Sequence, residues 1–147
     1  MGKQIIKPRF VDGVMLDPTL SRVVVIRKLR PDWQAGLLNC VGGKIEPGEA
    51  PLAAMNREFR EETSVSGLLW IPYCDMKLKL NDGELYCFYA IGNVDKAHTV
   101  LDEDVLILPV AEVMDRCDTL PSLRWLIQMA RSFAFGETIE KFNIKET

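Results

Sequence analysis

The chain has 147 residues, of which 48% are hydrophobic and 27% are charged. These proportions are typical of soluble globular domains and exclude a disordered tail protein or a low-complexity linker. A chain of this length is too short for two domains that each bury a sizeable core, so we expect a single domain over residues 1–147.

The charge balance and the apolar runs limit the partners that we expect. Lys and Arg number 18 and Asp and Glu number 21, which gives a net charge of −3 and argues against binding of duplex nucleic acid. The N-terminus has no apolar segment of signal-peptide length, and no apolar run reaches the ~18 residues that span a bilayer. We therefore expect a cytoplasmic protein that contacts no membrane, with its four cysteines as reduced thiols because their spacing is not that of a metal site.

The first third of the chain has the pattern of β-strands. Residues 22–26 form a β-branched run between two proline-containing turns, which is typical of a strand buried on both faces. Residues 10–16 are the expected neighbour of this strand. A third short apolar run over residues 37–41 ends at a pair of glycines, where we expect the strand to end.

A helix is predicted over Pro51–Thr63. Proline suits the first turn of a helix, and Leu52, Met55 and Phe59 recur at spacings of three and four, which places them on one apolar stripe. This stripe is expected to pack on the sheet.

The rest of the chain adds strands and a closing helix. The Asp82-Gly83 pair between apolar runs indicates a hairpin, and Ser122 resembles the N-cap of a last helix. Strands, a helix, further strands and a final helix favour an α/β fold, a sandwich in which helices cover both faces of a mixed sheet. Residues 136–147 receive no assignment. The further strands are expected over residues 68–71, 76–80, 85–91 and 105–110.

The most informative feature is a cluster of carboxylates on the predicted helix. At about 100° per residue, Glu61 lies roughly 60° to one side of Glu58 and Glu62 roughly 40° to the other, so all three project from one face. Such like charges destabilise a helix by about 0.2–0.5 kcal/mol per pair. A bound Mg²⁺ would offset that cost, because Mg²⁺ prefers carboxylate and phosphate oxygens. From the spacing alone, a solvated acidic surface paired with arginines is an equal alternative.

The glycines before this helix favour the metal. Gly42, Gly43 and Gly48 allow the backbone to approach a ligand closely and to form concavities lined with N–H donors, where phosphate oxygens bind. A glycine loop that leads directly into a helix with a carboxylate face supplies both parts that a metal–diphosphate complex needs.

This segment resembles the Nudix box, over residues 43–65. The box consists of Gly, five residues, Glu, seven residues, Arg-Glu, a bulky apolar residue, one residue, Glu-Glu, one residue, Gly and a bulky apolar residue. One position departs from it, because Ser64 stands where the box has its final Gly. The residues that match are Gly43, Glu49, Arg57, Glu58, Phe59, Glu61, Glu62 and Val65.

The resemblance implies a Nudix-like α/β/α sandwich and an enzyme. Its reaction would be the hydrolysis of a nucleoside diphosphate linked to another group, with Mg²⁺ or Mn²⁺ as cofactor. Glu58, Glu61 and Glu62 would be metal ligands, with Glu62 as the essential one, and the Gly43 carbonyl would add a further metal contact. The same resemblance gives Arg57 and Glu49 the role of orienting the glycine loop against the helix.

The resemblance leaves the general base open between Glu61 and the acidic cluster at residues 102–104. A solvated loop is the alternative interpretation of that cluster. We include Asp104, together with Asn39, Lys44 and Arg27, among the candidate substrate-binding residues.

The substrate is predicted from the approach to the box. Residues 36–44 resemble those of MutT-like enzymes, in which an Asn at the position of Asn39 contacts the base, so the first candidate is a nucleoside triphosphate cleaved to monophosphate and pyrophosphate. The acidic pair that this branch places before its last helix is absent here. ADP-ribose or another nucleotide sugar is the second candidate substrate. Trp33 is a candidate for base stacking, with a role in capping the core as the alternative.

Two other interpretations remain at this stage. Some domains with this fold bind nucleotides without hydrolysing them, and such domains tend to lose a box glutamate, whereas this chain keeps Glu58, Glu61 and Glu62. Members of the family often dimerise, so we also consider a homodimer.

Overall fold

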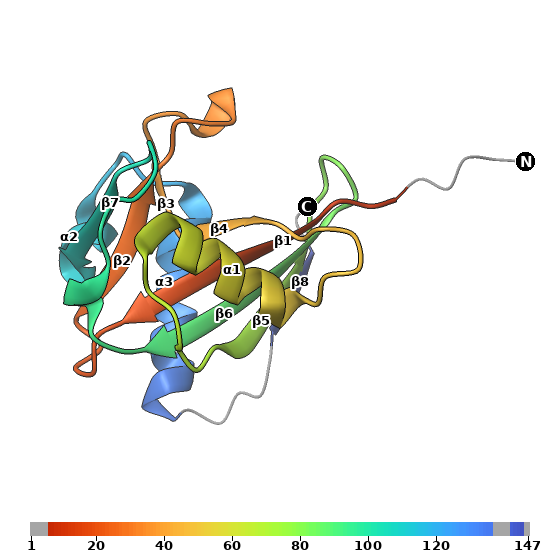
Figure 1. The fold of residues 1–147 in the computed structure, drawn as a ribbon. Helices are drawn as coiled ribbons and strands as arrows, with labels where there is room; N and C mark the ends of the chain where they lie inside the picture. Colours follow the sequence, from red (N-terminus) through yellow and green to blue (C-terminus); the bar gives the residue numbers. More distant parts are fainter. Residues whose placement is uncertain (1–5, 137–141, 146–147) are drawn as a thin grey trace, which may run out of the picture.

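A central β-sheet with helices on both faces forms the computed structural model, which describes residues 6–136 and 142–145 (Figure 1). The helices are α1 (Pro51–Thr63), α2 (Val110–Asp115) and α3 (Pro121–Phe135), with short 3-10 segments η1 (Asp32–Gln34) and η2 (Val94–Lys96). The strands are β1 (Arg9–Leu16), β2 (Arg22–Arg27), β3 (Leu38–Asn39), β4 (Val41–Lys44), β5 (Ile71–Lys77), β6 (Glu84–Ile91), β7 (Val105–Pro109) and β8 (Phe142–Lys145).

The sheet is mixed. Its strands follow the order β3-β2-β1-β6-β5-β8, with β4 also pairing with β1 and β7 with β2. The pairs β1–β6 and β5–β8 are parallel, and the other pairs are antiparallel. The predicted α/β sandwich with a mixed sheet is therefore confirmed.

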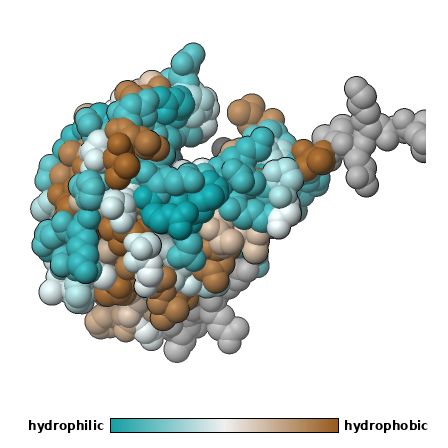
Figure 2. Space-filling model, viewed as in Figure 1, coloured by the Kyte–Doolittle hydropathy of each residue, from teal (hydrophilic) through white to brown (hydrophobic). Residues whose placement is uncertain are grey.

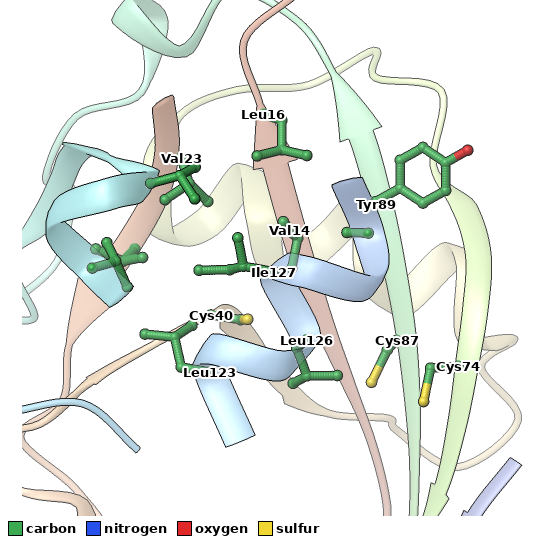
Figure 3. Packing of buried hydrophobic residues seen from close by; sticks show 14 of the residues in the cluster. Val14, Leu16, Val23, Cys40, Cys74, Cys87, Tyr89, Leu123, Leu126 and Ile127 are labelled. Carbon is green, nitrogen blue, oxygen red and sulfur yellow. The ribbon is translucent and has the colours of Figure 1, made fainter. Parts of the chain in front are cut away.

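The alternation of side chains along β1 divides the interior into two cores. Val11 and Met15 point to the face that α1 covers, where Phe59 of α1 lies edge-on to Trp70 with ring centroids 4.9 Å apart. Val14 and Leu16 point to the opposite face and pack against α3 (Figure 3). Each helix thus buries its apolar stripe on its own side of the sheet.

The predicted helix Pro51–Thr63 is confirmed with both ends, but its apolar stripe differs from the prediction. Met55 and Phe59 are fully buried, whereas the side chain of Leu52 is 48% exposed. Ala54 takes the buried position instead. The helix is therefore rotated so that small and large side chains share the contact with the sheet.

Several predicted boundaries were wrong. The strand expected over residues 37–41 is divided into β3 and β4, and β4 continues through the glycines at which we expected the strand to end. The expected strands over residues 68–71 and 76–80 are a single strand, Ile71–Lys77, followed by a loop, because the alternating lysines of that loop imitate a strand. The last helix begins at Pro121 rather than after Ser122, since proline fills its first turn and leaves Ser122 inside the helix. Trp125 on this helix is 38% exposed and not a core residue.

Two elements had no sequence signal that we recognised, namely α2 and β8. In β8, Phe142–Lys145 extends the sheet beside β5. No helix within residues 6–136 and 142–145 is long and apolar enough to cross a membrane. Residues 1–5, where we sought a targeting signal, lie outside the described residues.

The end of α1 explains why the box pattern has Gly at the position of Ser64. Ser64 is the C-cap and adopts the left-handed conformation with φ of 70°, and its N–H donates to the Arg60 carbonyl. A glycine takes this conformation without steric cost, whereas a residue with Cβ does not. Serine at this position therefore strains the backbone locally.

Ser64→Gly is expected to raise the free energy of unfolding by about 0.5–1 kcal/mol, because relief of the left-handed strain exceeds the added entropy of the unfolded chain. Urea unfolding measures this change. Ser66→Gly is the control, since Ser66 does not have a positive φ and its replacement should not stabilise the fold. If the Ser64→Gly protein is no more stable than the parent protein, the inference of backbone strain at Ser64 is wrong.

Candidate active site

The glycine loop lies against β1 and α1 so closely that side chains do not fit. Gly42 and Gly43 belong to β4, which pairs antiparallel with β1. A Cβ at Gly42 would lie 2.0 Å from the Val11 carbonyl oxygen, and a Cβ at Gly43 would lie 2.4 Å from Cδ of Glu58. The backbone of this loop therefore faces the carboxylates of α1 directly.

Arg57 links the loop to the helix. Its guanidinium donates two hydrogen bonds to the carboxylate of Glu49, at 2.7 and 2.8 Å, and one to the Lys44 carbonyl at 3.1 Å. It also donates to Glu58 at 2.8 Å and to Glu61 at 3.4 Å. The hydrogen bonds from Arg57 to Glu49 lower the pKa of Glu49 from its ordinary value of 4.5 to about 2. The structure thus brings four predicted site residues together around one cation.

Glu58 and Glu61 differ in exposure although both contact Arg57. The Glu58 side chain is 14% exposed, and burial raises its pKa against the opposing effect of Arg57. The Glu61 side chain is 48% exposed. The carboxylate of Glu61 is therefore the more accessible to solvent.

Glu62 lies in a separate environment. Burial raises its pKa, and the nearby Glu103 carboxylate raises it further, whereas Lys28 lowers it. Its Oε2 atom is buried and has no hydrogen-bond partner among the described residues. A buried carboxylate oxygen in this state is costly unless something satisfies it.

The acidic cluster at residues 102–104 is tied to the end of β2. Glu103 is 3% exposed and accepts hydrogen bonds from Lys28 Nζ at 3.1 Å and from the Leu29 N–H at 2.5 Å. Asp102 forms an ion pair with Arg30. The interpretation of the cluster as a solvated loop was therefore wrong for Glu103. The Lys28 side chain is itself only 17% exposed.

The candidate substrate-binding residues differ in how firmly their side chains are held. The Asn39 amide is engaged, because its Oδ1 accepts from the Cys40 N–H and its Nδ2 donates to Gln34. Arg27 donates to the Gly36 carbonyl and to Asp118. Lys44 and Asp104 have exposed side chains. The last two are thus the more accessible to a ligand.

The surface over α1 is polar and concave. Figure 2 shows strongly hydrophilic residues gathered over α1, and the surface is hollowed above them in this view. Trp33, in η1, is 65% exposed. It does not cap the core, which leaves its indole accessible.

Comparison with known proteins gives a family match over most of the chain. The model of the NUDIX domain family matches residues 7–118. The chain belongs to the Nudix family. The mouse (Mus musculus) ADP-sugar pyrophosphatase is 27% identical over 158 residues, which covers 95% of this chain and 72% of that protein. These matches support a Nudix hydrolase.

Solved Nudix structures share the fold at low sequence identity. The NUDIX domain of NrtR from Shewanella oneidensis, complexed with ADP ribose, has a TM-score of 0.75 and 18% identity, covering 88% of this chain and 90% of that chain. A MutT/Nudix family protein from Listeria innocua has a TM-score of 0.68 and 16% identity, covering 90% of this chain and 96% of that chain.

Nudix hydrolases generally use divalent metal ions, and the residues of this site fit one. The described residues include no group of three or more His, Cys, Asp or Glu side chains arranged around a single point. The donors are nevertheless of the right kind, because carboxylate oxygens suit hard cations. The buried, unsatisfied Oε2 of Glu62 is an atom that a cation would satisfy. The lack of a side chain at Gly43 lets the Glu58 carboxylate approach the backbone of the loop, so that carboxylate and carbonyl oxygens lie close together.

One acid beside the Nudix glycine loop was missed by sequence reasoning. Asp12 on β1 is the register partner of Gly42, and the residue is half-buried. Burial raises its pKa to about 7, against the opposing effect of Lys28. A lone aspartate in an apolar strand gives no sequence signal of this kind, because only the pairing of β1 with the glycine strand in the folded sheet places Asp12 beside Gly42.

The acid sensitivity of the fold is expected to depend on Glu49. Its folded pKa lies below the ordinary value, so the Arg57 pair stabilises the fold fully above pH 4.5 and loses this effect as the pH falls toward 2. Glu49→Gln should therefore lower the unfolding free energy at pH 7 and flatten its decline below pH 4.5. Urea unfolding at a series of pH values measures both.

Glu46→Gln is the control for this series. Glu46 is exposed on the same loop and should leave the pH dependence unchanged. An identical acid decline in Glu49→Gln and the parent protein would refute the role of the Arg57–Glu49 pair.

Proposed function

We propose that this Nudix hydrolase is a Mg²⁺-dependent pyrophosphohydrolase that splits a nucleoside diphosphate linked to another group, with ADP-sugars as its first substrate class. The observation that carries the proposal is the carboxylate face of α1, with Glu58 beside Gly43 and an unsatisfied oxygen on Glu62. Mn²⁺ is an alternative cofactor. Cleavage of the diphosphate bond by water would release two monophosphates from an ADP-sugar.

The residues of the site have different proposed roles, which follow from their surroundings. Glu58, Glu61 and Glu62, with the Gly43 carbonyl, would hold the metal, which neutralises diphosphate charge and activates water when bound. Arg57 and Glu49 keep the glycine loop in place against the helix, as their hydrogen bonds indicate. Their contribution is to position the donors rather than to react.

Glu61 is our proposed general base. Its carboxylate is the more exposed of the two bonded to Arg57, and its contact with Arg57 is the longer one, at 3.4 Å. Glu103 is held by Lys28 and the Leu29 N–H, and Asp102 is paired with Arg30, so both are engaged elsewhere. A general base needs a carboxylate that can accept a proton.

The preference for ADP-sugars rests on the relatives and on Asp118. The similarity to a mouse ADP-sugar pyrophosphatase covers almost the whole chain. A structural neighbour was solved with ADP ribose. Asp118, the acid before the last helix, is held by Arg116 and Arg27, which leaves it unsuited to contact a base.

A nucleoside triphosphate is the second candidate substrate. The approach to the box, with Asn39 followed by the glycine pair, favours it. Lys44 and Asp104, with exposed side chains beside the site, would contact either substrate. A purely nucleotide-binding role is less favoured, since all three helix carboxylates are kept. The cytoplasmic location and the homodimer stay predictions.

Turnover of a substrate panel tests the proposal. ADP-ribose, ADP-glucose, oxidised and ordinary nucleoside triphosphates and diadenosine polyphosphates are each incubated with Mg²⁺, and products are separated by ion exchange. We expect AMP and a sugar phosphate from the ADP-sugars. Glu62→Gln should lower kcat/KM by about 10²-fold or more, because it removes a charged donor from the reacting centre.

Glu112→Gln is the matched control, since Glu112 is an exposed acid on α2 that pairs with Arg116. It should retain parental activity. Cleavage confined to triphosphates would keep the mechanism and replace the substrate class. Binding of nucleotide without turnover by the parent protein would refute the enzymatic proposal.

A further inference from the structure

Two thiols that the proposed chemistry does not use lie side by side in the core that α3 covers. Cys74 on β5 and Cys87 on β6 are register partners in an antiparallel pair. They are 0% and 1% exposed, and they belong to the same core as Leu126 and Ile127 of α3. Figure 3 shows their sulfur atoms next to each other, on the same side of the sheet.

Their register is compatible with the geometry of a disulfide. Directly opposed residues in an antiparallel pair have Cα atoms about 4.5 or 5.5 Å apart, and disulfides bridge Cα separations of about 4.4–6.8 Å. The two thiols also form a side-chain hydrogen bond. A register shift between Pro72 and Cys74 interrupts the ladder next to the pair, where the backbone has room to adjust.

We propose that Cys74 and Cys87 are an oxidation site, which forms an intramolecular disulfide with a small-molecule disulfide as oxidant. The thiolate of one cysteine attacks the oxidant, forms a mixed disulfide and expels one small thiolate. The thiolate of the second cysteine then attacks the protein sulfur of the mixed disulfide and expels the other small thiolate. The two cysteines lose two protons and two electrons in total, and the oxidant becomes two small thiols.

The surroundings of the two cysteines determine how fast and how selectively they are oxidised. The hydrogen bond with Cys74, together with burial, raises the pKa of Cys87. Both thiols are buried, so exchange proceeds through local opening of the sheet and is slow. Cys40 belongs to the same core, but its sulfur lies apart from the pair (Figure 3). Cys117 is exposed and lies on the segment between α2 and α3.

The pair is separated from the carboxylate cluster by the sheet. The carboxylates project from α1, which covers one face, and the thiols point to the face that α3 covers. The modification therefore does not require the proposed hydrolysis. A disulfide here closes the loop between β5 and β6, which restricts the unfolded chain and stabilises the fold.

Redox equilibration of the full chain tests the site. Cys117→Ser protein is incubated in native buffer with reduced and oxidised glutathione at several ratios, quenched in acid, alkylated, digested and mapped by mass spectrometry. We expect a linked peptide pair that contains Cys74 and Cys87, two hydrogens lighter than the thiol form, to accumulate as the buffer becomes more oxidising. The oxidised protein should also show a higher Tm than the reduced protein.

Two controls fix the assignment. Cys40→Ala in the same background should leave the linked peptide unchanged, whereas Cys87→Ala should abolish it. Because buried thiols react slowly, the equilibration is repeated in urea just below the unfolding transition. Recovery of Cys74 and Cys87 as alkylated thiols there, or links distributed equally among Cys40, Cys74 and Cys87, would overturn the proposal. The map of the protein that retains both cysteines decides the question even if a variant fails to fold.

Discussion

The guanidinium of Arg57 connects the glycine loop to the helix by hydrogen bonds to Glu49 and to the Lys44 carbonyl. Without this cation, the loop and the helix would be joined mainly by backbone packing, and three neighbouring carboxylates would repel one another. The fork geometry of arginine suits this position, since one planar group reaches a carboxylate with two parallel bonds while contacting others. The remaining features of the site, including the approach of Gly43 to Glu58, require the loop to be fixed in this way.

The sheet separates two kinds of chemistry. Carboxylates and the glycine loop lie on the side of α1, and the paired thiols lie on the side of α3. β1 contributes side chains to both sides, with Met15 on one and Leu16 on the other. β6 does the same, with Cys87 on the thiol side and Phe88 on the side of α1.

Local patterns in the sequence predicted local structure well. The helix Pro51–Thr63 has proline at its start and an apolar stripe, so its bounds and its carboxylate face followed directly. Contacts between distant segments were not predictable. Lys28 and Glu103 are 75 positions apart and meet only because β2 pairs with β7. The pairing of β1 with β4 places Asp12 beside Gly42 in the same way. No periodicity in a single sequence encodes which strands become neighbours.

The order of strands in the sheet also constrains how the chain can fold as it is synthesised. β1 pairs with β6 and β2 pairs with β7, so the first two strands gain these partners only after most of the chain exists. Until then their apolar residues have only each other, β3, β4 and α1 to pack against. Closing such long loops costs entropy before the contacts are gained, which slows folding. A ribosome-bound N-terminal half would therefore expose apolar strands that bind chaperones, and folding would be completed late in synthesis.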